Sequence, residues 1–414
     1  MITLKTKHIT QKLKTMKINY LIKKTTLFLI SCIIITSCAM NNKNNQQLAS
    51  KMLDSLFNDR YGVSKLESNN VLLPGGMVLI KKGDSVLYEK GFGIADIAKN
   101  TKIDSNTFFN IASVSKQFTA VAILKLHSCG KININNSIYD INETVSSYLP
   151  KRNKEFEKIT IKHLMSHSSG IPDLRPRTDR NFVLTATDLE SLTYMKDLTK
   201  LNFVPGSNYE YMNPTFQLLY VIIESVSGKT FEDYMREEIF NPAKMNNTVY
   251  FEAERIIPNM SHGYIALDEN ASNKEFKEYD YGQESFFATK ADGGIYTSVE
   301  EFAKWEYALS KGLILDSTLL KEAYSPITKI SGSKFSSYQN RNYTSYGYGW
   351  FVDQTPNCPE KIYHTGDNGG FQIYAAKYPS KDLIILVFEN RNDNDRWQMA
   401  QKIDSIAIKA GWLK

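Results

Sequence analysis

The 414-residue sequence predicts an α/β domain of the α+β type, with an antiparallel sheet flanked by helices and a helical lobe inserted between its N- and C-terminal sheet segments. Strand-like apolar runs occur near both ends, at 76–88 and 371–388. Between them, residues from about 135 to 290 carry mostly helical patterns and polar loops. No internal repeat is visible, and 42% of the residues are hydrophobic, which is enough for a substantial core. We therefore expect one unit of two lobes, with a site in the cleft between them.

The N-terminal elements follow from apolar spacing. Residues 51–61 carry apolar side chains at helical intervals. Residues 76–80 and 85–88 predict two strands of a hairpin around Gly83-Asp84. The mostly apolar run 118–126 predicts a buried helix.

The C-terminal elements complete the predicted sheet. Residues 371–376 and 383–388 predict two further strands, joined by a turn at 379–382. A terminal helix should follow, because one helical stripe is formed by Trp397, Ala400, Ile403, Ile406 and Ala407.

The residues before the domain resemble a bacterial lipoprotein leader. Lys23-Lys24 precede the apolar run 27–35, which ends shortly before Cys38. Export signals have this order of charged and apolar residues. The run is too short for the roughly 20 residues of a spanning helix, which disfavours a transmembrane anchor. We expect an exported protein of the cell envelope, on the periplasmic or outer-membrane side, held at the membrane by lipid on Cys38. Its predicted segments are a signal peptide at 1–37, a tether at 38–50 and a domain at 51–414.

The formal net charge of +6 belongs to this leader. Seven lysines precede residue 25 and no acidic residue precedes Cys38, so the remaining chain is slightly acidic. A nucleic-acid partner therefore has no electrostatic support. Loss of the leader would leave Cys129 and Cys358, which form one disulfide in an oxidising compartment or stay as two free buried thiols.

The candidate chemistry centres on Ser113-Val114-Ser115-Lys116, which precedes the apolar run 118–126. If this stretch opens a helix, Ser113 and Lys116 lie on one face one turn apart. An adjacent amine activates a serine hydroxyl by taking its proton. The tetrapeptide alone is weak evidence, because Ser-x-x-Lys recurs at 128–131 and 331–334 in turn-like sequence. A helix-capping serine is the alternative at Ser113.

Further motifs follow Ser113 in a fixed order. They are Ile159 to Pro172, Pro205-Gly206 with Tyr209 to Asn213, Tyr346 to Trp350, and His364-Thr365-Gly366. In this order they resemble the serine beta-lactamase-related hydrolases, a family of class C beta-lactamases, D-alanyl-D-alanine carboxypeptidases and related esterases. The resemblance runs from about residue 50 to 410 and implies the beta-lactamase/transpeptidase-like fold.

The resemblance implies that Ser113 is the acyl-accepting nucleophile. Lys116 is one candidate for the general base, but its usual pKa of about 10.4 must be lowered by burial or a nearby cation. Tyr211 is the other candidate, as a phenolate favoured by Lys116, and the sequence leaves this choice open. Asn213 offers an amide that would orient the lysine and a substrate carbonyl.

The resemblance also places substrate-binding residues at His364-Thr365-Gly366. The backbone amides of Ser113 and Asp367 are expected to hold the oxyanion of the tetrahedral intermediate. Gly366 is expected to leave room for close approach of the substrate. Class C beta-lactamases carry lysine at the position of His364, and histidine is mostly neutral at pH 7. This departure disfavours an efficient beta-lactamase, and a purely structural histidine is the alternative.

No metal site and no cofactor are expected. His163 and His167 are four residues apart, but the further ligands of a metal site are missing, and no Gly-x-Ser-x-Gly motif occurs. We therefore expect a serine hydrolase that acts through an acyl-enzyme on an amide or ester of a small or peptide-like substrate, in a D-alanyl peptidase-like or esterase-like reaction. The alternatives are a true beta-lactamase and a non-catalytic penicillin-binding-type envelope receptor.

Overall fold

The structure is a computed structural model that describes residues 23–24, 44–61, 72–176, 178–250, 257–268, 275–279, 289–333, 341–393 and 395–414. The apolar run 27–35 and the acylation site Cys38 lie outside these ranges, so the leader and its lipid anchor stay predictions. Within the described ranges, no helix combines the length and the apolar character needed to cross a membrane.

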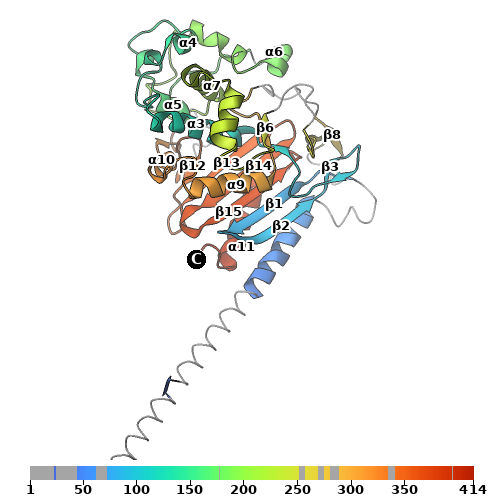
Figure 1. The fold of residues 1–414 in the computed structure, drawn as a ribbon. Helices are drawn as coiled ribbons and strands as arrows, with labels where there is room; N and C mark the ends of the chain where they lie inside the picture. The colour runs from blue at the N-terminus through green and yellow to red at the C-terminus, as the bar shows by residue number, and fades with distance from the viewer. Residues whose placement is uncertain are drawn as a thin grey trace, which may run out of the picture.

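An eight-stranded antiparallel sheet joins the two ends of the chain (Figure 1). β1 pairs with β2 on one side and with β15 on the other, so the N-terminal hairpin lies beside the last strand. The predicted class and both predicted strand pairs are confirmed. In spatial order the strands are β10 (Thr328–Lys329), β11 (Thr344–Tyr346), β12 (Phe351–Asp353), β13 (Lys361–Asn368), β14 (Phe371–Tyr378), β15 (Leu383–Glu389), β1 (Gly76–Lys82) and β2 (Ser85–Phe92).

Alternating side chains divide the core between the two faces of this sheet. In β1, Met77 and Leu79 belong to one buried cluster and Val78 and Ile80 to the other, because successive strand residues point to opposite faces. The cluster of Val78 includes the N-terminal helix 44–61 and α11 (Arg396–Lys409). The cluster of Met77 includes α3 (Lys116–Ser128) and α9 (Val299–Ser310). Helices therefore cover both faces (Figure 1).

Within the range 135–290, where a helical lobe was expected, the described helices lie between Ile138 and Phe240, and they form a lobe beyond one end of the sheet (Figure 1). Its helices are η2 (Ile138–Asp140), α4 (Glu143–Ser146), η3 (Phe156–Lys158), α5 (Ile161–Met165), α6 (Arg180–Thr185), η4 (Glu190–Asp197), α7 (Asn213–Ser227), α8 (Phe231–Met235) and the π-helical turn η5 (Arg236–Phe240). The described residues also form small sheets of β3 (Ile94–Asp96) with β4 (Thr101–Lys102), of β5 (Phe109–Asn110), β9 (Ile295–Thr297) and β6 (Val249–Tyr250), and of β7 (Tyr264–Ala266) with β8 (Phe276–Glu278). The remaining helices are η1 (Ala112–Ser115), α10 (Ser317–Ala323) and η6 (Pro379–Lys381).

Two local expectations change in the folded chain. The first helix begins at residue 44, inside the range predicted as a tether, and Ala49 is already buried. Packing against the sheet stabilises this helix despite its polar first turn. Cys129 and Cys358 are both free, and both are exposed rather than buried.

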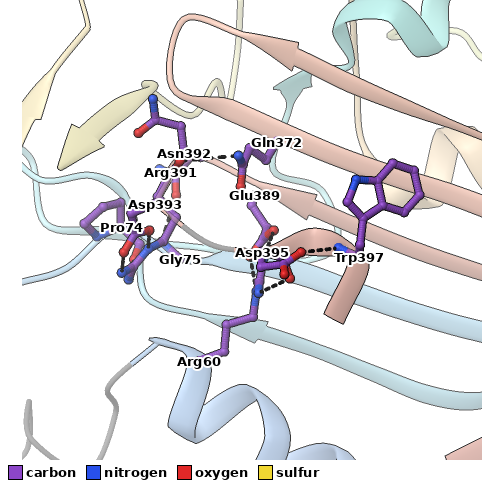
Figure 2. A network of polar contacts seen from close by, with 11 residues as sticks. Arg60, Pro74, Gly75, Gln372, Glu389, Arg391, Asn392, Asp393, Asp395 and Trp397 are labelled. Atoms are coloured by element: carbon purple, nitrogen blue, oxygen red, sulfur yellow. Dashed lines mark hydrogen bonds and ion pairs between the residues drawn. The ribbon is translucent and has the colours of Figure 1, made fainter. Parts of the chain in front are cut away.

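A buried ion pair fixes the N-terminal helix to the end of β15 (Figure 2). Arg60 donates two hydrogen bonds of 2.7 Å to Glu389, from Nε to Oε1 and from Nη2 to Oε2. Arg60 is 8% exposed and Glu389 only 1%. Nearby, Arg391 binds Asp393 and donates to the carbonyl of Pro74. These contacts join the N-terminal part of the chain to the end of β15, the strand that pairs with β1.

We expect Glu389→Gln to lower the free energy of unfolding by about 3 kcal/mol, because the Arg60 guanidinium would stay buried without its carboxylate. Urea unfolding measures this loss. Asp140→Asn is the matched control, since Asp140 pairs with Arg152 on the surface and such pairs add little stability. Similar losses in the two variants would contradict the assignment.

Candidate active site

Ser113 lies on the single 3₁₀ turn η1, directly ahead of α3. The turn begins with Ala112 at a φ of 45°, and the Oδ1 of Asn110 accepts a 2.9 Å hydrogen bond from the Ala112 amide. Positive φ is uncommon for alanine, so this contact helps to hold a strained entry to the turn. The N-cap of α3 is Ser115, without a side-chain capping bond. Ser113 is therefore not a capping serine of α3, and its side chain stays partly exposed.

Lys116 is the first residue of α3 and is completely buried. Its Nζ lies 3.0 Å from Ser113 Oγ and donates to the carbonyl of Asp292 over 2.7 Å. Burial lowers the pKa of Lys116 to about 8, a shift that Asp292 opposes and Arg175 reinforces. A lowered pKa of this kind is the condition under which Lys116 was expected to act as a general base.

Tyr211 approaches the same ammonium from the helical lobe, and Asn213 follows two residues later in the chain. Lys116 Nζ lies 5.0 Å from the centroid of the Tyr211 ring, close enough for a cation–π interaction. Asn213 is the first residue of α7, where Pro214 suits the opening turn. Among the described residues, the buried Oδ1 of Asn213 has no hydrogen-bond partner. It is therefore an acceptor available to a ligand or to the lysine.

His167 is a site residue that the sequence did not reveal. Its carbonyl accepts from the amide of Glu210 over 2.9 Å, and its Nδ1 accepts from the amide of Met212 over 3.1 Å. These two bonds bracket Tyr211, whose ring centroid lies 4.2 Å from that of His167. Burial, with Lys116 and His364 nearby, holds the pKa of His167 well below its ordinary value. The neutral imidazole therefore acts as a fixed support for Tyr211.

His163 and His167 do not combine into a metal site. The Nδ1 of His163 accepts from the amide of Thr160 over 3.2 Å, as part of the N-terminal cap of α5. In the part of the chain that the structure describes, no group of three or more His, Cys, Asp or Glu side chains is arranged to hold a metal ion.

His364 lies on β13 with both ring nitrogens engaged. Its Nδ1 lies 2.7 Å from the Thr365 carbonyl, which only accepts, so Nε2 is the acceptor for the Tyr346 hydroxyl at 2.9 Å. Burial, followed by the charge of Lys116, lowers the pKa of His364 to about 3. His364 is therefore a neutral side chain and not a fixed cation.

The strand at Gly366 lies against the turn that carries Ser113. A side chain at Gly366 would place its Cβ only 2.4 Å from the carbonyl oxygen of Ile111. The glycine thus permits close contact between β13 and the residue that precedes η1, and the approach of substrate at Gly366 stays a prediction. Next along the strand, Asp367 forms an ion pair with Arg396 of α11. Thr365, which precedes Gly366 on β13, is also buried.

The fold thus gathers Ser113, Lys116, Tyr211 and His364 from the sheet and the helical lobe. A further contributor is the backbone of 289–295, which supplies the carbonyl that holds Lys116. No sequence motif identifies this segment, because every residue provides a backbone carbonyl whatever its side chain.

A family model described as "Beta-lactamase" matches residues 63–407. This chain belongs to the beta-lactamase family. Within the family, it is 25% identical over 338 residues to penicillin-binding protein 4* of Bacillus subtilis, covering 78% of this chain and 70% of that protein. It is 27% identical over 325 residues to protein flp of Staphylococcus aureus, covering 77% of this chain and 60% of that protein. This chain therefore spans about three fifths of the length of flp.

A solved structure shares the fold of this beta-lactamase family member. D-amino acid amidase from Ochrobactrum anthropi, in complex with L-phenylalanine amide, superposes with a TM-score of 0.67 at 19% identity. The superposition covers 88% of this chain and 98% of the amidase. The beta-lactamase/transpeptidase-like fold expected from the sequence is confirmed.

Proposed function

We propose that this beta-lactamase family member is a serine hydrolase that forms an acyl-enzyme on Ser113. The observation that carries the proposal is the 3.0 Å contact between Ser113 Oγ and Lys116 Nζ. Burial lowers the pKa of that lysine to about 8, so about a tenth of the amine is neutral at pH 7. A neutral amine at this distance accepts the serine proton as the hydroxyl attacks.

The reaction proceeds through two acyl transfers. Ser113 Oγ attacks the substrate carbonyl carbon, and its proton passes to Lys116, directly or through Tyr211. The tetrahedral intermediate then expels an amine or alcohol, which takes up that proton. Water then attacks the carbonyl carbon of the acyl-enzyme and gives its proton to the same base. Ser113 Oγ leaves and takes that proton back, which releases the acid and restores the serine. The amides of Ser113 and Asp367 remain the proposed donors to the oxyanion.

The state of His364 bears on the substrate class. A neutral imidazole with both nitrogens bonded inside the protein supplies no positive charge for a substrate carboxylate. This disfavours efficient hydrolysis of beta-lactams and favours an esterase-like reaction, whereas a D-alanyl peptidase-like reaction would need another group to bind the carboxylate of its substrate. It also leaves open a receptor that is acylated by penicillin but does not release the acyl group.

Intact-protein mass spectrometry tests the proposal after incubation with a penicillin or a fluorophosphonate. We expect one adduct on the wild type and none on Ser113→Ala. If the wild type forms no adduct, the assignment of Ser113 as the nucleophile is refuted. Turnover of nitrocefin, a D-Ala-D-Ala peptide, a D-amino acid amide and a short-chain p-nitrophenyl ester then identifies the reaction. An adduct without turnover of any substrate would favour the receptor.

A further inference from the structure

A backbone turn at 290–292 contacts the buried ammonium of Lys116. The carbonyl of Asp292 accepts the 2.7 Å hydrogen bond from Lys116 Nζ. One residue earlier, the carbonyl of Ala291 accepts from the hydroxyl of Thr119, also over 2.7 Å. The turn thus faces the first two turns of α3, and its position decides where the lysine nitrogen lies.

Asp188 holds this turn from the opposite side. It lies in the helical lobe between α6 and η4 and is only 2% exposed. Its Oδ2 accepts from the amide of Lys290 over 2.6 Å, and its Oδ1 accepts from the amide of Ala291 over 3.1 Å. A carboxylate that accepts two adjacent amides fixes both the place and the orientation of a backbone segment. Asp188 therefore holds two peptide units that lie just before the Asp292 carbonyl, with one peptide unit between.

The Asp292 side chain is a second buried carboxylate beside the ammonium. It is 4% exposed, and its Oδ1 accepts from Gln217 of α7 over 3.4 Å. Its negative charge favours the protonated form of Lys116 and thus opposes the effect of burial. It also faces Asp188, and burial together with Asp292 raises the pKa of Asp188 to about 7. The two carboxyl groups and the ammonium therefore form one buried charge cluster.

We propose that Asp188 is a positioning residue for Lys116, acting through the turn 290–292, and that the Asp292 carboxylate is the charge partner of the same lysine. This inference rests on the proposed function, since it assigns the two carboxyl groups to the base of that reaction. Among the described residues, other charged or titratable groups that act on the cluster include Lys290 and Arg175 in loops, Tyr211, Tyr220 of α7, Tyr250 of β6, His167 and His364.

Asp188→Asn and Asp292→Asn separate the two roles. An asparagine at 188 places an N–H₂ opposite one of the two amides, so the turn loses a bond and shifts. Misplacement of the lysine nitrogen should lower the plateau rate of Ser113 acylation by about ten- to a hundredfold. Asp292→Asn keeps the backbone carbonyl but removes a negative charge. It should move the midpoint of the pH–rate profile to lower pH by about one pH unit, with a smaller loss of plateau rate.

The measurement is the rate of fluorophosphonate labelling of Ser113 between pH 5 and pH 10, normalised to folded protein. Glu232→Gln is the matched control. It removes an acid that pairs with the Lys290 side chain but leaves the amides held by Asp188 untouched, so we expect wild-type rate and midpoint. Wild-type profiles in both aspartate variants would overturn the inference. So would a rate loss in Asp188→Asn that disappears after normalisation, because that loss would be structural alone.

An independent readout separates this inference from the proposed function. In Ser113→Ala protein with ¹³C-labelled lysine, the resonance that titrates near pH 8 is assigned to Lys116 by its absence in Lys116→Met. Asp292→Asn should lower its midpoint whether or not Ser113 reacts. If the wild type does not react with the fluorophosphonate but Asp292→Asn shows the lowered midpoint, the serine hydrolase proposal is refuted and the role of Asp292 as charge partner stands. If the wild type reacts but Asp292→Asn leaves the midpoint unchanged, the role of Asp292 as charge partner is refuted.

Discussion

Lys116→Ala is expected to slow acylation of Ser113 by about a thousandfold, within the range of a lost general base. Lys116 Nζ is 3.0 Å from Ser113 Oγ, and burial has brought its pKa down from 10.5 to about 8. The alanine variant keeps the serine but removes the proposed acceptor of its proton. Fluorophosphonate labelling at pH 8, with quenched time points, measures the loss.

The pH dependence of labelling tests whether Lys116 is the titrating group. Because the neutral amine is the reactive form, the wild-type rate should rise with pH, reach half its plateau near pH 8 and level off above about pH 9. Lys116→Ala should lose this rise. Lys125→Ala is the control on the same helix, where the side chain contacts Glu238 instead. Equal rates in Lys116→Ala and Lys125→Ala would refute the assignment.

Tyr211→Phe is expected to slow acylation by about a hundredfold. The Tyr211 ring lies 5.0 Å from Lys116 Nζ and is supported by His167 from behind. Phenylalanine keeps the ring and the cation–π contact, so the variant removes only the hydroxyl from the proton path. Its pH–rate midpoint should remain near 8 if Lys116 is the base that titrates.

The same experiment decides between the two candidate bases. A midpoint that moves in Tyr211→Phe would assign the titration to the tyrosine. Tyr209→Phe is the matched control in the same aromatic cluster, and its backbone contact with Ser333 does not need the hydroxyl. We expect near-wild-type labelling in this control. A loss as large as that of Tyr211→Phe would mean that the cluster tolerates no substitution and that Tyr211 has no special role.

Local patterns in the chain were sufficient for most of the fold. Short apolar runs within 76–88 and 371–388, each next to turn residues, predicted the paired strands, because this signal lies within each strand and its own turn. The first helix was placed too late, since its polar opening residues carry no helical signal and only the packing of Leu53, Phe57 and Tyr61 on the sheet stabilises it. The exposure of Cys129 and Cys358 was likewise a property of the assembled surface.

The sequence by itself determined the family, the order of the motifs and the pairing of Ser113 with Lys116, because three residues span one helical turn. Only the tertiary structure decided the electrostatic state of the site. The pKa of Lys116 depends on complete burial and on Asp292, which is 176 positions away in sequence. His364 is neutral because the fold buries it beside Lys116, and Asp188 acts through backbone amides that any residue would provide. Burial and long-range charge are properties of the packed chain, and no spacing along the sequence encodes them.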